Sequence, residues 1–200
     1  ASPPSMRVAL LYPPPWKLPR QGTLPDPEHG PPEEFRSGDL DADFYQLPYG
    51  LMSLAAQCSA AGHEVTLLNL SAFDWETVEE VIQRQAAEVY GFSCWTANRR
   101  GVALAAEAVK RLVPGAHVVV GGPHATALAE DLLSHHHAID TVCVGEGEDT
   151  LLELISRIAE GKSADGLAGA VVRSADGGLS RGPSRPAIAP LDRLVDPHTL

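Results

Sequence analysis

Residues 118–126 read VVVGGPHAT, in which three β-branched residues precede two glycines, a proline and a histidine. The apolar run is typical of a strand that is covered on both faces of a sheet. The two glycines leave the backbone bare where that strand ends, so a ligand can approach it closely there. The stretch therefore raises two possibilities, a loop that binds phosphate and a metal ligand at His124.

Similar apolar runs recur along the chain and alternate with helical patterns. In one of the helical patterns, Val102, Ala105, Ala106 and Val109 form a single apolar stripe. Buried strands that alternate with helices form parallel sheets with right-handed crossovers. We therefore predict an α/β, Rossmann-like (flavodoxin-like) fold whose five parallel strands have the order 2-1-3-4-5. The strands are expected at residues 6–12, 64–70, 88–93, 117–122 and 140–145, and the helices at 49–61, 74–87, 98–112, 126–134 and 148–160.

Two segments lie outside this alternation. Residues 13–47 are rich in proline and follow the first strand, where such folds normally use roughly two to six residues. Near the other end, LAGAVVR and LSRG flank SADGG, which predicts a β-hairpin with a glycine-rich turn. We predict one domain at residues 1–165, which contains the irregular insertion 13–47. A hairpin and linker at 166–200 are expected to lead toward a further domain.

Composition excludes several classes of protein. Lys and Arg number 15 against 26 for Asp and Glu, and the basic residues form no stripe, which argues against nucleic acid as a partner. No apolar stretch reaches the ~20 residues of a membrane span, and no signal-peptide pattern is seen, so we expect a cytoplasmic protein without a membrane partner. Cys58, Cys94 and Cys143 lie far apart in apolar segments, which is typical of buried thiols in a reducing compartment. No CxxxCxxC spacing occurs, so the chain alone holds no iron–sulfur cluster.

The ends of the strands are the expected ligand site, because open parallel sheets bind ligands beyond their carboxyl ends where the strand order reverses. Neither GxGxxG nor GxxxxGK[ST] follows any strand. The nearest match, GEGED, carries Glu146, Glu148 and Asp149, which would repel a phosphate. These acids suit the start of a helix, where carboxylates cap N–H groups and interact with the dipole. Glycines, hydroxyls and aromatic residues at the strand ends instead favour a large, flat and mostly apolar ligand.

The order and spacing of several segments resemble one known family. These are LYPPP, LPYGLMSLAAQCSAAGHEVTLLNL, GFSCWTANRRG, VVVGGPHAT, VGEGEDTLLELI and PLDRL. Together they resemble the N-terminal cobalamin-binding domain of cobalamin-dependent radical S-adenosylmethionine enzymes of the methyltransferase type. The resemblance implies a corrin ring over the carboxyl edge of the sheet and a nucleotide tail beside the first and third strands. In such enzymes a further domain supplies the 4Fe-4S cluster and the S-adenosylmethionine site, so the chain is expected to be the cofactor-carrying part and that radical SAM domain its partner.

Carried over by position, the resemblance implies a set of cofactor-binding residues at the strand ends. The loop 93–96 would face the lower side of the ring, residues 121–124 would admit the tail, and residues 145–148 would contact its polar edge. The turn 47–50 and Tyr12 would border the corrin. The full set is Tyr12, Pro13, Tyr49, Gly50, Ser93, Cys94, Trp95, Thr96, Asn98, Gly121, Gly122, Pro123, His124, Gly145, Glu146, Gly147 and Glu148. No catalytic residue and no metal ligand is assigned.

The resemblance also implies how cobalt is held. Other cobalamin enzymes place a histidine on cobalt through a DxHxxG motif after the first strand, whereas residues 12–16 read YPPPW here. The one D-x-H, at residues 196–198, lies at the far end of the chain. We expect (methyl)cobalamin to be held base-off, without a histidine ligand, for methyl transfer to a carbon centre. Two alternatives stay open: the same domain in a ring-forming or ring-contracting radical enzyme, and a flavodoxin-like regulatory or nucleotide-binding module without corrinoid.

Individual residues have simpler interpretations beside these. Trp95 fits either a place under the corrin or the core. Cys94 fits a thiolate ligand of cobalt, but its apolar neighbours predict a high pKa and a structural role. Glu146 and Glu148 fit either an acid–base pair or capping and hydrogen-bonding roles. The three histidines at 135–137 point about 100° apart on a helix and cannot converge on one metal ion.

Overall fold

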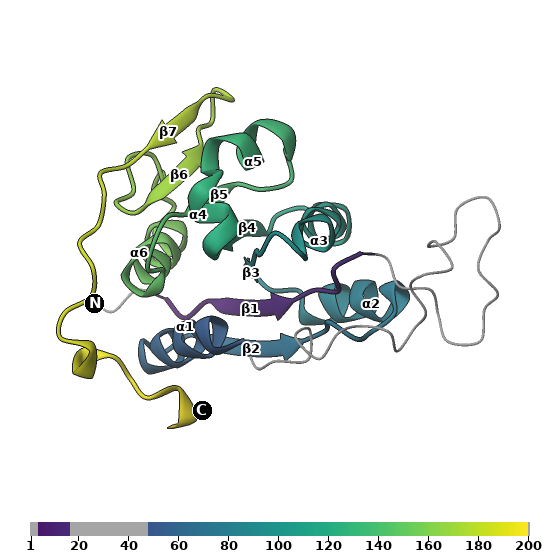
Figure 1. Cartoon of the computed structure of the whole chain (residues 1–200), viewed down its shortest axis with the longest axis horizontal. Helices are drawn as coiled ribbons and strands as arrows, with labels where there is room; N and C mark the ends of the chain where they lie inside the picture. The colour runs from purple at the N-terminus through teal and green to yellow at the C-terminus, as the bar shows by residue number, and fades with distance from the viewer. Residues whose placement is uncertain (1–3, 17–47, 200) are drawn as a thin grey trace.

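The strands form one sheet in a computed structural model that describes residues 4–16 and 48–199 (Figure 1). Five strands are parallel: β1 (Arg7–Tyr12), β2 (Glu64–Asn69), β3 (Val89–Ser93), β4 (His117–Gly121) and β5 (Thr141–Cys143). Their spatial order is β2-β1-β3-β4-β5, so the predicted order 2-1-3-4-5 is confirmed. The order reverses at β1, which places the carboxyl ends of β1 and β3 beside each other.

The predicted hairpin consists of β6 (Ala170–Arg173) and β7 (Leu179–Arg181). Beyond the prediction, it extends the sheet, because β6 pairs antiparallel with β5 and β7 pairs antiparallel with β6. Over residues 4–16 and 48–199 the sheet therefore has seven strands and is mixed rather than wholly parallel. The hydrogen bonding of the sheet runs without a break from β5 into β7.

Helices cover both faces of the sheet and enclose two separate cores. On one face, α1 (Tyr49–Ala60) and α6 (Glu148–Ala159) pack against alternate strand residues such as Val8, Leu10 and Val119. On the other face lie α2 (Trp75–Gln85), α3 (Arg99–Leu112), α4 (Pro123–Ala127) and α5 (Ala129–His135). Figure 1 shows α1 and α6 together at one side of the sheet. This arrangement makes the space between α1 and α6 the natural place for a pocket.

Helix boundaries agree with the sequence patterns except after β4. The predicted stripe of α3 is confirmed, since Val102, Ala105, Ala106 and Val109 are all buried. The single helix predicted at residues 126–134 is wrong: two short helices occupy this region. Pro123 starts the first of them because its fixed φ suits the first helical position. The backbone then leaves the helical region at Leu128, with φ −130° and ψ 37°, before α5 begins.

After β7 the chain runs back along the outside of α6 to α1. Two short 3₁₀ turns lie on this path, η2 (Leu191–Arg193) and η3 (Pro197–Thr199). Of the predicted insertion 13–47, only residues 13–16 are among the described residues, and of the turn 47–50 residue 47 lies outside them. No helix among residues 4–16 and 48–199 is long and apolar enough to span a membrane.

Candidate functional site

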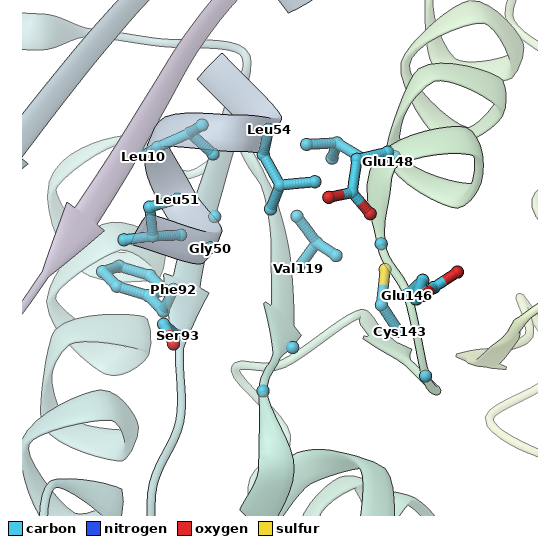
Figure 2. Close-up of a pocket in the computed structure, with 16 residues that line it drawn as sticks. Leu10, Gly50, Leu51, Leu54, Phe92, Ser93, Val119, Cys143, Glu146 and Glu148 are labelled. Atoms are coloured by element: carbon cyan, nitrogen blue, oxygen red, sulfur yellow. The ribbon is translucent and has the colours of Figure 1, made fainter. Parts of the chain in front are cut away.

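A pocket of about 240 Å³ opens at the carboxyl ends of the strands, between α1, α6 and the sheet (Figure 2). Its lining is mostly apolar, with glycines and a few polar groups at the rim. The lining residues are Leu10, Gly50, Leu51, Leu54, Gly91, Phe92, Ser93, Val119, Gly121, Gly122, Cys143, Gly145, Glu146, Gly147, Glu148 and Leu151. The predicted site residues Gly50, Ser93, Gly121, Gly122 and residues 145–148 thus come together here.

The pocket is deep because Gly91, in the middle of β3, has no side chain to fill its base. In the sheet, Gly91 lies between Leu10 of β1 and Val119 of β4. A Cβ atom built on Gly91 would stand 2.6 Å from Cδ2 of Leu10. The prediction missed Gly91, although a glycine inside the strand VYGFS is the usual sign of a close approach to the backbone.

The side walls are apolar and come from the two covering helices. Leu51 and Leu54 project from α1, and Leu151 projects from α6. Cys143 adds a thiol, whose pKa burial raises to about 12, so this thiol stays neutral near pH 7. The walls therefore suit a neutral, apolar group. They were missed in the sequence because leucines at helical spacing are what any core helix also shows.

The rim carries two carboxylates with different environments. The Glu148 carboxylate accepts a hydrogen bond from the Ser53 hydroxyl of α1 (2.8 Å) and lies on the pocket side in Figure 2. Glu146 points away from the pocket and accepts a hydrogen bond from the Ile188 N–H. The two carboxylates do not face each other, which argues against an acid–base pair. Both carboxylates instead have the predicted hydrogen-bonding role, and Glu148 lies in the first turn of α6, although no side-chain capping bond is found there among the described residues.

Gly121 and Gly122 lie next to each other but serve different purposes. Among the described residues, a Cβ atom on Gly121 would meet only Cβ of Cys143, at an ordinary 3.7 Å. Gly122 has φ +101°, and a Cβ atom there would stand 2.8 Å from the carbonyl oxygen of Cys94. The fold itself therefore requires glycine at 122, whereas glycine at 121 leaves space at the pocket.

The loop after β3 is held by a buried asparagine. The Asn98 side chain, with 0% exposed, accepts a hydrogen bond from the Trp95 N–H (2.7 Å) and donates one to the Ser93 carbonyl (3.0 Å). The Cys94 N–H donates to the Gly121 carbonyl (2.7 Å), which ties this loop to the end of β4. The loop presents Trp95 with 51% of its surface exposed, so Trp95 is not a core residue.

The cysteine of this loop is a structural residue. Burial raises the pKa of Cys94 to about 12, and the nearby Arg99 lowers it only in part. The thiol is therefore protonated near pH 7 and does not offer the thiolate that a metal would bind. This agrees with the expectation from its apolar neighbours.

The remaining predicted residues do not line the pocket. Tyr12 is half-buried, Pro13 is buried, and Tyr49 is exposed at the start of α1. Pro123 is the first residue of α4, and the ring of His124 lies 3.1 Å from the Thr96 hydroxyl. His124 lines a separate groove formed by α3, α4 and α5. Within residues 4–16 and 48–199, no group of three or more His, Cys, Asp or Glu side chains is placed to hold a metal ion.

Comparison with known families identifies this arrangement. The family model described as the B12 binding domain matches residues 40–155. The chain belongs to the B12-binding domain family. The cofactor expected from the sequence, cobalamin, is thus the ligand of its family, and the pocket of this B12-binding domain lies within the matched residues except for Leu10.

Related proteins are longer than this B12-binding domain. An uncharacterised methyltransferase from Pyrococcus horikoshii is 28% identical over 152 residues, which is 75% of this chain and 33% of that protein. The anaerobic magnesium-protoporphyrin IX monomethyl ester cyclase of a Synechocystis species is 31% identical over 116 residues, or 56% of this chain and 23% of that protein. The chain thus spans about a third or less of the length of these relatives.

A solved structure shares the fold. It is the radical S-adenosylmethionine methyltransferase TsrM from Kitasatospora setae with cobalamin and a [4Fe-4S] cluster bound. Its TM-score is 0.62 at 21% identity, over 96% of this chain and 31% of that one. At this identity the likeness establishes the fold and leaves the activity of the whole protein to be proposed.

Proposed function

We propose that this B12-binding domain holds cobalamin with its nucleotide tail in the pocket between α1 and α6. The pocket's volume of about 240 Å³ is below the roughly 300–1,000 Å³ of sites that enclose a whole small ligand. It therefore suits one part of cobalamin, and its apolar walls suit the aromatic base of the tail. The observation that carries the proposal is the depth of the pocket, which the bare backbone of Gly91 creates.

The corrin ring would then lie outside the pocket, over the carboxyl ends of the strands. The loop 93–98 supports this placement because its internal hydrogen bonds fix the exposed Trp95 at that edge. Aromatic side chains pack well against flat rings. Gly145, with φ +81° and nothing near its missing Cβ, leaves further bare backbone at the same edge.

With its base in the pocket, the cofactor would be bound base-off. Residues 12–16 offer no histidine at the end of β1 to replace the base. Cys94 is no substitute, because its thiol is protonated and buried. Trp95, exposed at this edge, would pack against the corrin ring, and neither a histidine at residues 12–16 nor the Cys94 thiol would serve as a ligand of the metal.

We further propose that the full-length protein is a radical S-adenosylmethionine methyltransferase with a 4Fe-4S cluster in a separate domain. Cobalamin, when bound, would carry methyl groups, and the residues of this chain would bind and orient the cofactor. The methyltransferase name of the Pyrococcus horikoshii relative and the fold of TsrM support this reading. The Synechocystis cyclase, 31% identical, favours a second candidate, a ring-forming enzyme built on the same domain.

Retention of a corrinoid tests the binding proposal. The chain is mixed with hydroxocobalamin, desalted, and its visible absorbance spectrum is recorded. We expect one corrinoid for each chain, with a spectrum that lacks coordination by the base. A colourless protein after desalting would refute the proposal, and a spectrum with the base on cobalt would refute the placement of the tail.

A further inference from the structure

The pocket's width depends on the separation of α1 and α6. Leu51 and Leu54 of α1 face Leu151 of α6 across the cavity. On the inner side the two helices are joined by the hydrogen bond between Ser53 and Glu148 (2.8 Å). Helices bond internally along their length and not to the sheet, so contacts between side chains set how far apart these two lie.

Residues 188–195, here called the strap, cross the outer side of the same two helices. The Ile188 N–H donates to the Glu146 carboxylate just before α6. The Arg193 guanidinium then binds both oxygens of Asp149 in the first turn of α6, at 2.5 and 3.1 Å. A two-pronged arginine–carboxylate pair fixes geometry better than a single contact does. These contacts hold the strap against α6.

The far end of the strap is bonded to α1 through one buried side chain. The Gln57 amide donates to the Val195 carbonyl (3.0 Å) and accepts from the Val195 N–H (3.2 Å). Gln57 is only 8% exposed, so its polar atoms would lack water if these bonds were lost. The pairing is 138 positions apart in sequence, and it links the outer face of α1 to a segment already bound to α6.

The chain just before the strap is anchored independently of α1. The Arg185 guanidinium pairs with Glu153 of α6 (2.5 Å), and the Gly169 N–H donates to the Pro183 carbonyl (2.8 Å). Breaking the contacts of Arg193 and Gln57 would therefore release residues 193–195 from the two helices, while Ile188 stays bonded to Glu146 and the hairpin β6–β7 stays in the sheet.

We propose that the strap fixes the separation of α1 and α6, which makes Gln57 and Arg193 positioning residues for the cofactor's nucleotide tail. None of residues 188–195 lines the pocket, so they act through the helices and not by contact with the ligand. The proposal rests on the proposed function, because the tail must enter this pocket. It also implies that a displacement of the chain after residue 195 changes the affinity for the cofactor.

The test compares two corrinoids that differ only in the tail. Hydroxocobalamin carries the nucleotide tail, and aquacobinamide has the same ring without it. Dissociation rates of both are measured for the wild type and for the double variant Gln57→Met/Arg193→Ala. Methionine keeps the length of the glutamine side chain and removes both hydrogen bonds. We expect cobalamin to dissociate about tenfold faster from the variant and cobinamide to dissociate at the wild-type rate.

Arg181→Ala is the matched control, since it removes another half-exposed ion pair, Arg181–Glu130 (2.6 Å), on the hairpin. Arg181→Ala should change neither dissociation rate. Arg193→Lys in place of Arg193→Ala should restore part of the slow dissociation of cobalamin. If the double variant does not fold, the single variant Arg193→Ala replaces it, and the expected increase in the cobalamin dissociation rate is smaller. Equal effects of the double variant on both corrinoids, or no effect on either, would overturn the role of the strap. If the wild type still retains cobalamin, the proposed function would stand. A wild type that retains neither corrinoid would refute both.

Discussion

Gly122 should be the least replaceable residue at the end of β4. Its φ of +101° and ψ of 175° belong to a region that is essentially restricted to glycine and that costs other residues about 1–3 kcal/mol. The new Cβ would also stand 2.8 Å from the Cys94 carbonyl oxygen, in backbone that the bond to Gly121 holds in place. We therefore expect Gly122→Ala to cost about 3 kcal/mol. At roughly 2–4 °C per kcal/mol for a chain of this size, Tm should fall by about 6–12 °C.

Gly121→Ala is the control, because the same methyl group there meets Cys143 at an ordinary distance of 3.7 Å. Thermal unfolding of both variants without ligand, followed by circular dichroism, measures the difference. The Tm of Gly121→Ala should stay within about 2 °C of the wild type, since alanine suits a strand slightly better than glycine. Equal Tm values for the two variants would refute the assignment of Gly122 to the fold and Gly121 to the pocket.

Three further predictions concern the pocket, the loop after β3 and the stability of the fold at low pH. Val119→Phe should fill the cavity and weaken cobalamin binding at least tenfold in an equilibrium titration, while Tm changes little; undiminished binding would place the tail elsewhere. Asn98→Ala should lower the free energy of unfolding by about 1–3 kcal/mol in urea titrations, because the Trp95 N–H and the Ser93 carbonyl lose their partner; a change below about 0.5 kcal/mol would contradict the loop's assigned anchor. Burial lowers the pKa of His63 below its usual 6.5, and its Nδ1 accepts a hydrogen bond from the Met6 N–H. Below pH 6.5 the unfolded chain thus binds a proton that the folded chain resists, so the free energy of unfolding should fall from pH 6.5 downward, and less steeply in His63→Gln; identical pH profiles would contradict this.

The sheet could be predicted because its strands are buried on both faces. Runs such as VVVGG, which alternate with amphipathic helices, indicate buried parallel strands, and 2-1-3-4-5 is a common order for sheets of this kind. The attachment of β6 to β5 could not be read in the same way. Antiparallel pairing at a sheet edge leaves no periodicity that differs from that of a free hairpin.

Apart from Gly50 in the first turn of α1, the site could be predicted where glycine or polar residues follow a strand. Gly121, Gly145 and Glu148 were found for that reason, and they do line the pocket. The apolar walls, Leu54 and Leu151, look the same in sequence as any core leucine. The Gln57–Val195 pairing joins residues 138 positions apart, and no local pattern records it.

The most direct test of the central claim is a crystal structure of the chain grown with hydroxocobalamin. We predict electron density for the aromatic base between Leu54 and Leu151, against Gly91 and Val119, with the corrin ring outside over Trp95. Density for the base on cobalt, with the cavity between α1 and α6 left to solvent, would contradict the account.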